Sequence, residues 1–172
     1  MKKQILKAIG GASLAILVLA VFAQVWVSAQ DNDNELLRNG NGGNERSLVG
    51  SWDVQVTIRD CQTGTPFFSF PAMMTYNLGG TMQESDLGGP VLVRLPGHGV
   101  WESQNGRHYS AAFQFLNFNP DRTFAGRNVV RSTIRLGQHG DTFTATDTVE
   151  ILNANGEVIN RGCSTSTATR FR

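Results

Sequence analysis

The sequence predicts an all-β domain, built as an eight-stranded antiparallel up-and-down barrel. From Leu48 onward, apolar and polar residues alternate and no window shows a helical period. Turn residues, chiefly glycine and asparagine, interrupt this alternation at short intervals, which is typical of all-β domains. The two cysteines of the chain also fall where closure of such a barrel would bring them together.

Eight runs of residues carry the strand pattern, and they are joined in sequence by mostly short connections. The predicted strands are residues 52–59, 66–76, 81–86, 98–103, 108–118, 123–136, 142–152 and 157–171. Asn105-Gly106 is the strongest hairpin signal among the connections. Consecutive antiparallel neighbours form a meander, and eight strands suffice to close a barrel. A two-sheet sandwich is the alternative, but it usually needs crossing connections for which these short turns leave little chain.

The cysteine pair supports the closed barrel independently. Cys61 ends the first predicted strand and Cys163 lies early in the last. In a closed meander these strands are antiparallel neighbours, so the two residues meet; in an open sheet they lie far apart. An even cysteine count in an exported chain predicts a disulfide, and a bridge over so long a loop stabilises by up to ~4–5 kcal/mol on the chain-entropy model.

The first residues predict export. Lys2, Lys3 and Lys7 precede an uncharged stretch that ends at Val27-Ser28-Ala29, the pattern of a signal peptide cleaved after Ala29. The stretch is also long enough to span a bilayer, so an uncleaved anchor is the alternative, and contact with a membrane is expected only in that case. We therefore expect a signal peptide (1–29), a flexible polar leader (30–47) and a barrel domain (48–172), with a secreted or periplasmic location.

Composition and motifs exclude several functions. After the signal segment the chain has no lysine and slightly more acidic residues than arginines, without basic clusters, so nucleic acid is not an expected partner. The three histidines are isolated and no zinc-ligand spacing occurs, so no metal is expected. No P-loop, Rossmann or G-x-S-x-G pattern occurs after the signal segment, and no cofactor is expected.

One short motif resembles a known family. Gly50-Ser51-Trp52 at the start of the first strand resembles the G-x-W motif of the lipocalins and the wider calycin group. The resemblance implies an eight-stranded barrel that holds a small hydrophobic molecule, with an arginine of the last strand packed over the tryptophan. Arg170 and Arg172 stand where antiparallel pairing would bring them near Trp52. Allene oxide cyclases share this barrel shape, which keeps an enzymatic interpretation open.

Strand alternation also predicts which side chains point into the barrel. In residues 142–152 the apolar alternate positions place Asp147 inside, where a salt bridge to Arg161 on the next strand would be the purely structural explanation. A two-residue turn at Asn105-Gly106 would pair Glu102 with Tyr109. That register predicts an interior that is mostly aromatic and aliphatic, with six polar exceptions: His98, Glu102, Tyr109, Asn128, Ser132 and Asp147. The alternatives are that Glu102 lies at the barrel rim in water, that His98 is a loop residue and that Tyr109 is a core residue with its hydroxyl satisfied.

The connection from Leu87 to Gly97 is unusually apolar for a loop. In a meander it lies at the end opposite Trp52, where it would act as a lid over the barrel mouth, with Leu92 contacting a ligand. The alternative is an extra short strand folded against the barrel.

These features support three functional hypotheses. The first is an exported carrier that binds a mostly apolar small molecule without catalysis, through six candidate residues: Tyr109, Phe113, Phe115, Asn128, Asp147 and Leu92. The second is a cyclase or isomerase in which Glu102 or Asp147 acts as general acid or base and Tyr109 donates a hydrogen bond. The third is a packed barrel that serves as a structural or interaction domain.

Overall fold

The computed structural model describes residues 47–86 and 93–172. Within these residues there are nine strands and no helix. The strands are β1 (Gly50–Arg59), β2 (Pro66–Tyr76), β3 (Thr81–Asp86), β4 (Val93–Arg94), β5 (Gly97–Asn105), β6 (His108–Phe118), β7 (Phe124–Leu136), β8 (Thr142–Asn153) and β9 (Val158–Arg170). The expected signal peptide and the leader up to residue 46 lie outside the described residues, as does Leu92. None of the described segments forms a helix long and apolar enough to cross a membrane.

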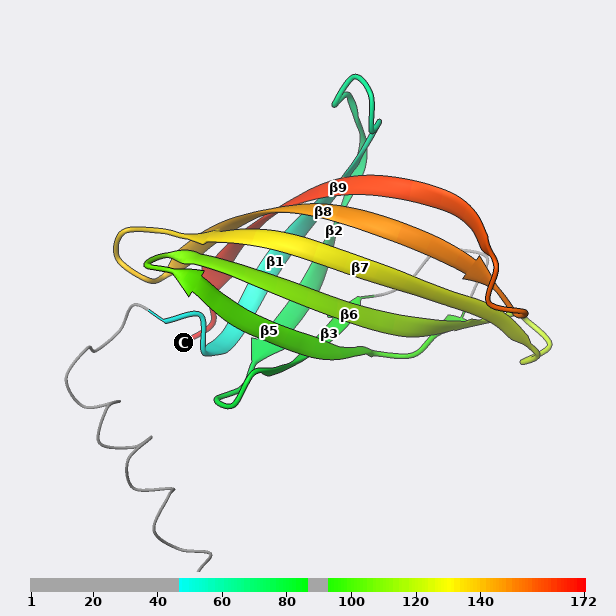
Figure 1. Cartoon of the computed structure of the whole chain (residues 1–172), viewed down its shortest axis with the longest axis horizontal. Coiled ribbons are helices and arrows are strands. Elements are labelled where there is room, and N and C mark those ends of the chain that lie inside the picture. Colours follow the sequence, from blue (N-terminus) through cyan, green and yellow to red (C-terminus); the bar gives the residue numbers. More distant parts are fainter. Residues whose placement is uncertain (1–46, 87–92) are drawn as a thin grey trace, which may run out of the picture. The chain divides into compact units, whose positions relative to one another are not determined.

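The eight long strands form a closed antiparallel barrel, which confirms the predicted fold class. Each long strand pairs with the next along the chain, and β9 pairs back with β1. In that last pairing Arg170 lies opposite Trp52 and Cys163 lies opposite Arg59. Figure 1 shows β9, β8, β7, β6 and β5 side by side in that order. This is the architecture that the calycin resemblance implies.

The ninth strand belongs to the apolar connection between the third and fourth predicted strands. Val93 and Arg94 of β4 pair with Phe118 and Asn117 at the end of β6. The described end of this connection therefore forms the extra short strand that was the alternative to a free lid.

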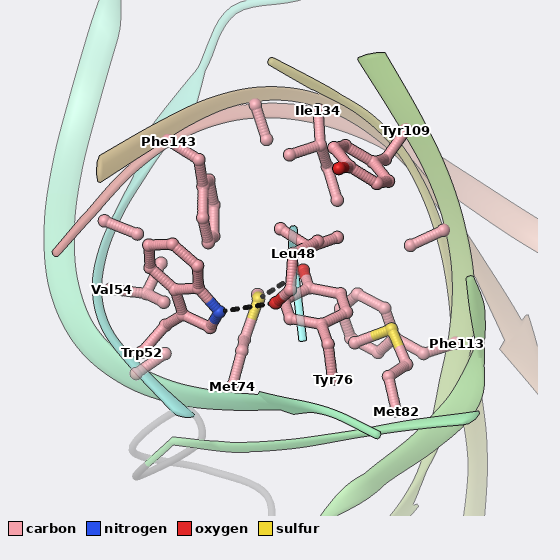
Figure 2. Close-up of a cluster of buried hydrophobic side chains, with 14 of the residues drawn as sticks. Leu48, Trp52, Val54, Met74, Tyr76, Met82, Tyr109, Phe113, Ile134 and Phe143 are labelled. Atoms are coloured by element: carbon pink, nitrogen blue, oxygen red, sulfur yellow. Dashed lines mark hydrogen bonds between the residues drawn. The ribbon is translucent and has the colours of Figure 1, made fainter. Parts of the chain in front are cut away.

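The barrel end at Trp52, which we call the floor, is solidly packed. The Trp52 side chain is completely buried, and its Nε1–H donates a hydrogen bond to the Leu48 carbonyl oxygen, 3.0 Å away (Figure 2). Phe143 packs edge-on against Trp52 with ring centroids 4.9 Å apart. The Arg170 guanidinium carbon lies 4.2 Å from the centre of the Trp52 ring. Of the two arginines predicted for this role, Arg170 takes it, whereas Arg172 pairs with Asp141.

Cys61 and Cys163 form the predicted disulfide. Their Cα atoms are 5.2 Å apart although 102 positions separate them in the sequence. The bond joins the chain just after β1 to β9, so it covalently ties the first strand of the barrel to the last. Disulfides of this kind are typical of oxidising compartments.

The predicted register of the β5–β6 hairpin is wrong by one residue. The turn residues are Gly106 and Arg107, with Gly106 at φ +52°, rather than Asn105 and Gly106. An irregularity between Ser103 and Asn105 then places Ser103, not Glu102, opposite Tyr109. A shift of one residue moves every side chain of a strand to the opposite face.

The corrected register reverses which β5 side chains point inward. Trp101 lies opposite the buried Ala111 and packs against the core. Glu102 and His98 are exposed on the outer face, so both expected interior positions are wrong. The Glu102 carboxylate accepts hydrogen bonds there from Gln104 and Ser110.

Candidate functional site

The interior of the barrel grades from a solid floor to a looser mouth. The completely buried large side chains collect around the floor: Leu48, Trp52, Tyr76, Met82, Ile134 and Leu136. Toward the opposite end, which we call the mouth, the inward apolar side chains are only partly buried: Ile58, Phe70, Phe115 and Val149. The mouth half is therefore the less completely buried half of the interior.

Asp147 is the central polar group of this interior. It projects from β8 and is 5% exposed. Its Oδ2 atom accepts hydrogen bonds from the hydroxyls of Ser164, at 2.9 Å, and Ser166, at 3.1 Å, both on β9. Ser132, directly opposite on β7, also hydrogen-bonds to the carboxyl group. Burial raises the pKa of Asp147, and the three serine hydroxyls oppose that rise by stabilising the ionised form.

The expected ion pair between Asp147 and Arg161 does not form. Arg161 lies on the outer face of β9, where its guanidinium is 3.6 Å from Glu150. Outer residues cannot reach an inner carboxylate because successive side chains of a strand point to opposite faces. The interior position of Asp147 itself is as predicted.

A second polar group lies beside the mouth, where Arg94 of β4 points inward. Its guanidinium forms ion pairs with Glu84 and Asp86 of β3, and all three side chains are nearly fully buried. The Arg94 guanidinium also lies over the Phe115 ring, 3.5 Å from its centre. These contacts attach the short strand β4 to the interior of the barrel.

Glu84 is the most strongly perturbed carboxyl group of this cluster. Burial raises the pKa of Glu84 to about 7, and the neighbouring Arg94 charge only partly offsets the rise. Gly97 provides the room for this carboxylate. A Cβ atom at Gly97 would lie 2.8 Å from Glu84 Oε2 and 3.0 Å from the Phe113 ring.

Tyr76 lies close to both carboxyl groups. Burial raises its pKa, and the charges of Asp147 and Glu84 raise it further. Its hydroxyl donates to Met74 Sδ at 3.3 Å, which is a weak acceptor (Figure 2). The hydroxyl is therefore a hydrogen-bond donor inside the barrel on which both acidic groups act electrostatically.

The other predicted site residues divide between floor and mouth. Phe113 is buried and Phe115 is half-buried on the inner face of β6. Asn128, on β7, accepts a hydrogen bond from Asn117 at 2.9 Å. Tyr109 belongs instead to the floor, where its ring is 5.8 Å from Trp101.

Sequence reasoning missed Glu84, Arg94 and Tyr76. A signal for Glu84 was available, because Met82, Glu84 and Asp86 share one face of a short strand that follows a glycine turn. Tyr76 pairs with Met82 across that turn and so shares the same face. The available signal for Arg94 was that it is the only charged residue in the apolar connection from Leu87 to Gly97.

The outer surface also carries a hollow, of about 990 Å³, that extends over β1, β2, β8 and β9. Its lining includes the threonines of β8 and β9 together with Arg107 and Arg135. These side chains are largely exposed, and Asp86, a polar residue of the lining whose side chain is nearly fully buried, already pairs with the inward-pointing Arg94. The interior is therefore the better candidate site.

Among the residues that the structure describes, no group of three or more histidine, cysteine or acidic side chains is placed to hold a metal ion. No model of a known protein family matches the chain, and no curated protein matches it.

Proposed function

We propose that the protein is an exported barrel of the calycin kind that binds a small, mostly apolar molecule in the mouth half of its interior, without catalysis. The observation that carries the proposal is the gradient along the barrel axis. A floor whose large side chains, apart from the partly buried Trp101, are almost completely buried gives way to half-buried Ile58, Phe70, Phe115 and Val149 toward the mouth. Ligand sites are typically concave, mostly apolar and supplied with a few well-placed polar groups.

The rim of the mouth supports the same proposal. Exposed large apolar side chains collect on the strand ends and turns at this end of the barrel: Phe67, Phe68, Val93, Leu95, Phe124, Val158 and Ile159. Exposed apolar patches commonly mark sites of interaction on soluble proteins. Such a rim suits the passage of an apolar molecule between solvent and the interior.

Export is part of the proposal and rests on two features. The sequence begins with a signal-like segment, and the Cys61–Cys163 disulfide suits an oxidising compartment outside the cytoplasm. The carrier would then meet its ligand in the periplasm or in the external medium.

The first test is native mass spectrometry of the protein purified from its own host, in search of a bound molecule. The second uses the neutral apolar dye N-phenyl-1-naphthylamine with two matched variants. Val149→Asn places an amide in the mouth half and is expected to weaken dye binding at least tenfold. Val100→Asn makes the same change at a side chain that is 60% exposed on the outer face, and it should leave binding unchanged. Absence of a bound molecule together with absence of dye binding would favour the packed structural barrel.

A second candidate is a cyclase or isomerase that resembles the allene oxide cyclases. The observation that favours it is Glu84, because a buried carboxyl group with a pKa of about 7 suits proton transfer near neutral pH. In this alternative Glu84 replaces Glu102 as the acid–base candidate beside Asp147. Chromatography of the recovered ligand before and after incubation with the protein separates the two functions. Conversion that Glu84→Gln abolishes while binding persists would establish the enzyme.

A further inference from the structure

We infer that the ligand of the proposed carrier is an apolar amine, whose ammonium group pairs with the Asp147 carboxylate inside the barrel. The inference rests on the binding function proposed above and assigns the chemical class of its ligand. Its basis is that the interior contains buried carboxyl groups for which the described arginines supply too few cationic partners.

Asp147 is buried among hydroxyl donors and has no counter-ion among the described residues, and burial raises its pKa above the usual value. Hydroxyl groups from β7 and β9 converge on the carboxyl group, and two of them donate to the same oxygen, Oδ2. Donation of two hydroxyls to one oxygen favours an ionised carboxylate over a protonated carboxyl. None of the ion pairs formed by the described residues includes Asp147. A buried ionised carboxylate is costly unless a cation pairs with it.

Two arginines on the strands beside Asp147, and the one that points inward at the mouth, already pair with other carboxylates. Arg131 and Arg161 both pair with Glu150 on the outer face. Arg94, which points inward at the mouth, is shared by Glu84 and Asp86. The mouth half thus holds more carboxyl groups than its guanidinium can neutralise, so an incoming cation would be stabilised there and an incoming anion would be repelled.

The aromatic wall of the interior also suits a cation. The Arg94 guanidinium lies 3.5 Å from the centre of the Phe115 ring. One aromatic ring of the interior therefore already contacts a positive charge on its face. Cations are attracted to the faces of aromatic rings, and more strongly where water is excluded. An amine with an apolar body would therefore match both the carboxylate and the walls that lead to it.

The test compares three probes that share one apolar body and differ in charge. They are 2-(1-naphthyl)ethylamine, 2-(1-naphthyl)ethanol and 1-naphthaleneacetate, and their binding to the full-length mature protein is measured by titration calorimetry at pH 7.5. We expect the amine to bind at least about tenfold more tightly than the alcohol, and the carboxylate to bind most weakly. Asp147→Asn should make the amine and the alcohol bind equally. The matched control Glu150→Gln removes a carboxylate from the outer face of the same strand and should preserve the tenfold preference.

A pH series on the wild-type protein gives an independent measurement if Asp147→Asn does not fold. Asp147 acts electrostatically on Tyr76 of β2, and Glu84 of β3 acts on the same tyrosine. Protonation of Asp147 removes the charge that would pair with the ammonium group, so the preference for the amine should shrink as the pH is lowered while the affinity for the alcohol stays constant.

The outcomes separate the inference from the function on which it rests. If none of the three probes binds and no molecule co-purifies, the carrier proposal itself fails. If the alcohol or the carboxylate binds as tightly as the amine, the barrel is a carrier but the assignment of an amine is overturned. A preference for the amine that survives in Asp147→Asn, or that does not change with pH, overturns the role of Asp147.

Discussion

Replacement of Trp52 by alanine is the sharpest test of the barrel floor. The side chain is completely buried, and its indole N–H is bonded to the buried Leu48 carbonyl oxygen. Removal of a large core aromatic residue costs about 3–5 kcal/mol, and the carbonyl left without its donor adds about 1–3 kcal/mol. Because such contributions are not additive, we expect Trp52→Ala to lower the free energy of unfolding by about 5 kcal/mol.

Two further variants divide that loss into its parts. Trp52→Phe keeps a ring against Phe143 and beneath Arg170 but removes the N–H donor, so it should cost about 1–3 kcal/mol. Trp101→Ala is the matched control, because Trp101 also donates to a backbone carbonyl, that of Asn77 at 3.0 Å, but is only partly buried. It should cost clearly less than Trp52→Ala.

The assay is urea unfolding with the disulfide intact, followed by far-ultraviolet circular dichroism. The free energies of unfolding of the variants are compared under the condition that the slope of the free energy against urea concentration is unchanged. A loss below about 1 kcal/mol for Trp52→Ala would mean that the floor tolerates a cavity and that the Gly50-Ser51-Trp52 motif does not anchor the barrel. An equal loss for Trp101→Ala would show that burial of Trp52 is not what sets the cost.

Two other predictions concern the disulfide and the acidic interior. Alkylation of the denatured, unreduced protein should label neither Cys61 nor Cys163, and labelling of both would contradict the covalent closure of the barrel. The free energy of unfolding of the wild type, minus that of Glu84→Gln, should fall by up to about 3 kcal/mol as the pH rises from about 4.5 to 7. The sign follows because the folded carboxyl group, with a pKa of about 7, binds more protons in this range than the unfolded one, so raising the pH favours unfolding. Parallel pH profiles for the two proteins, measured by urea unfolding, would refute the shift.

Local alternation predicted the interior wherever a strand has a clear apolar face. Phe143, Ala145 and Asp147 of β8 are all buried, as the alternation in residues 142–152 indicates. The prediction failed for β5, where His98 and Glu102 were expected inside. There the two sides of the strand differ little in polarity, so the register depended on the turn, and the turn lies one residue further along than the Asn105-Gly106 pattern suggests.

The sequence by itself determined the order of the eight barrel strands, their antiparallel closure and the pairing of Cys61 with Cys163. These features follow from periodicity, from short connections and from the geometry of a meander, which are local or topological properties of the chain. The partners of the buried charges were decided only by the tertiary structure. Arg94 meets Glu84 because β4 docks at the end of β6 and turns one side chain inward, and Asp147 meets serines rather than Arg161 because Arg161 lies on the other face of β9. Such contacts depend on the registers of several strands at once, and a shift of one residue in any of them would exchange the inner and outer faces.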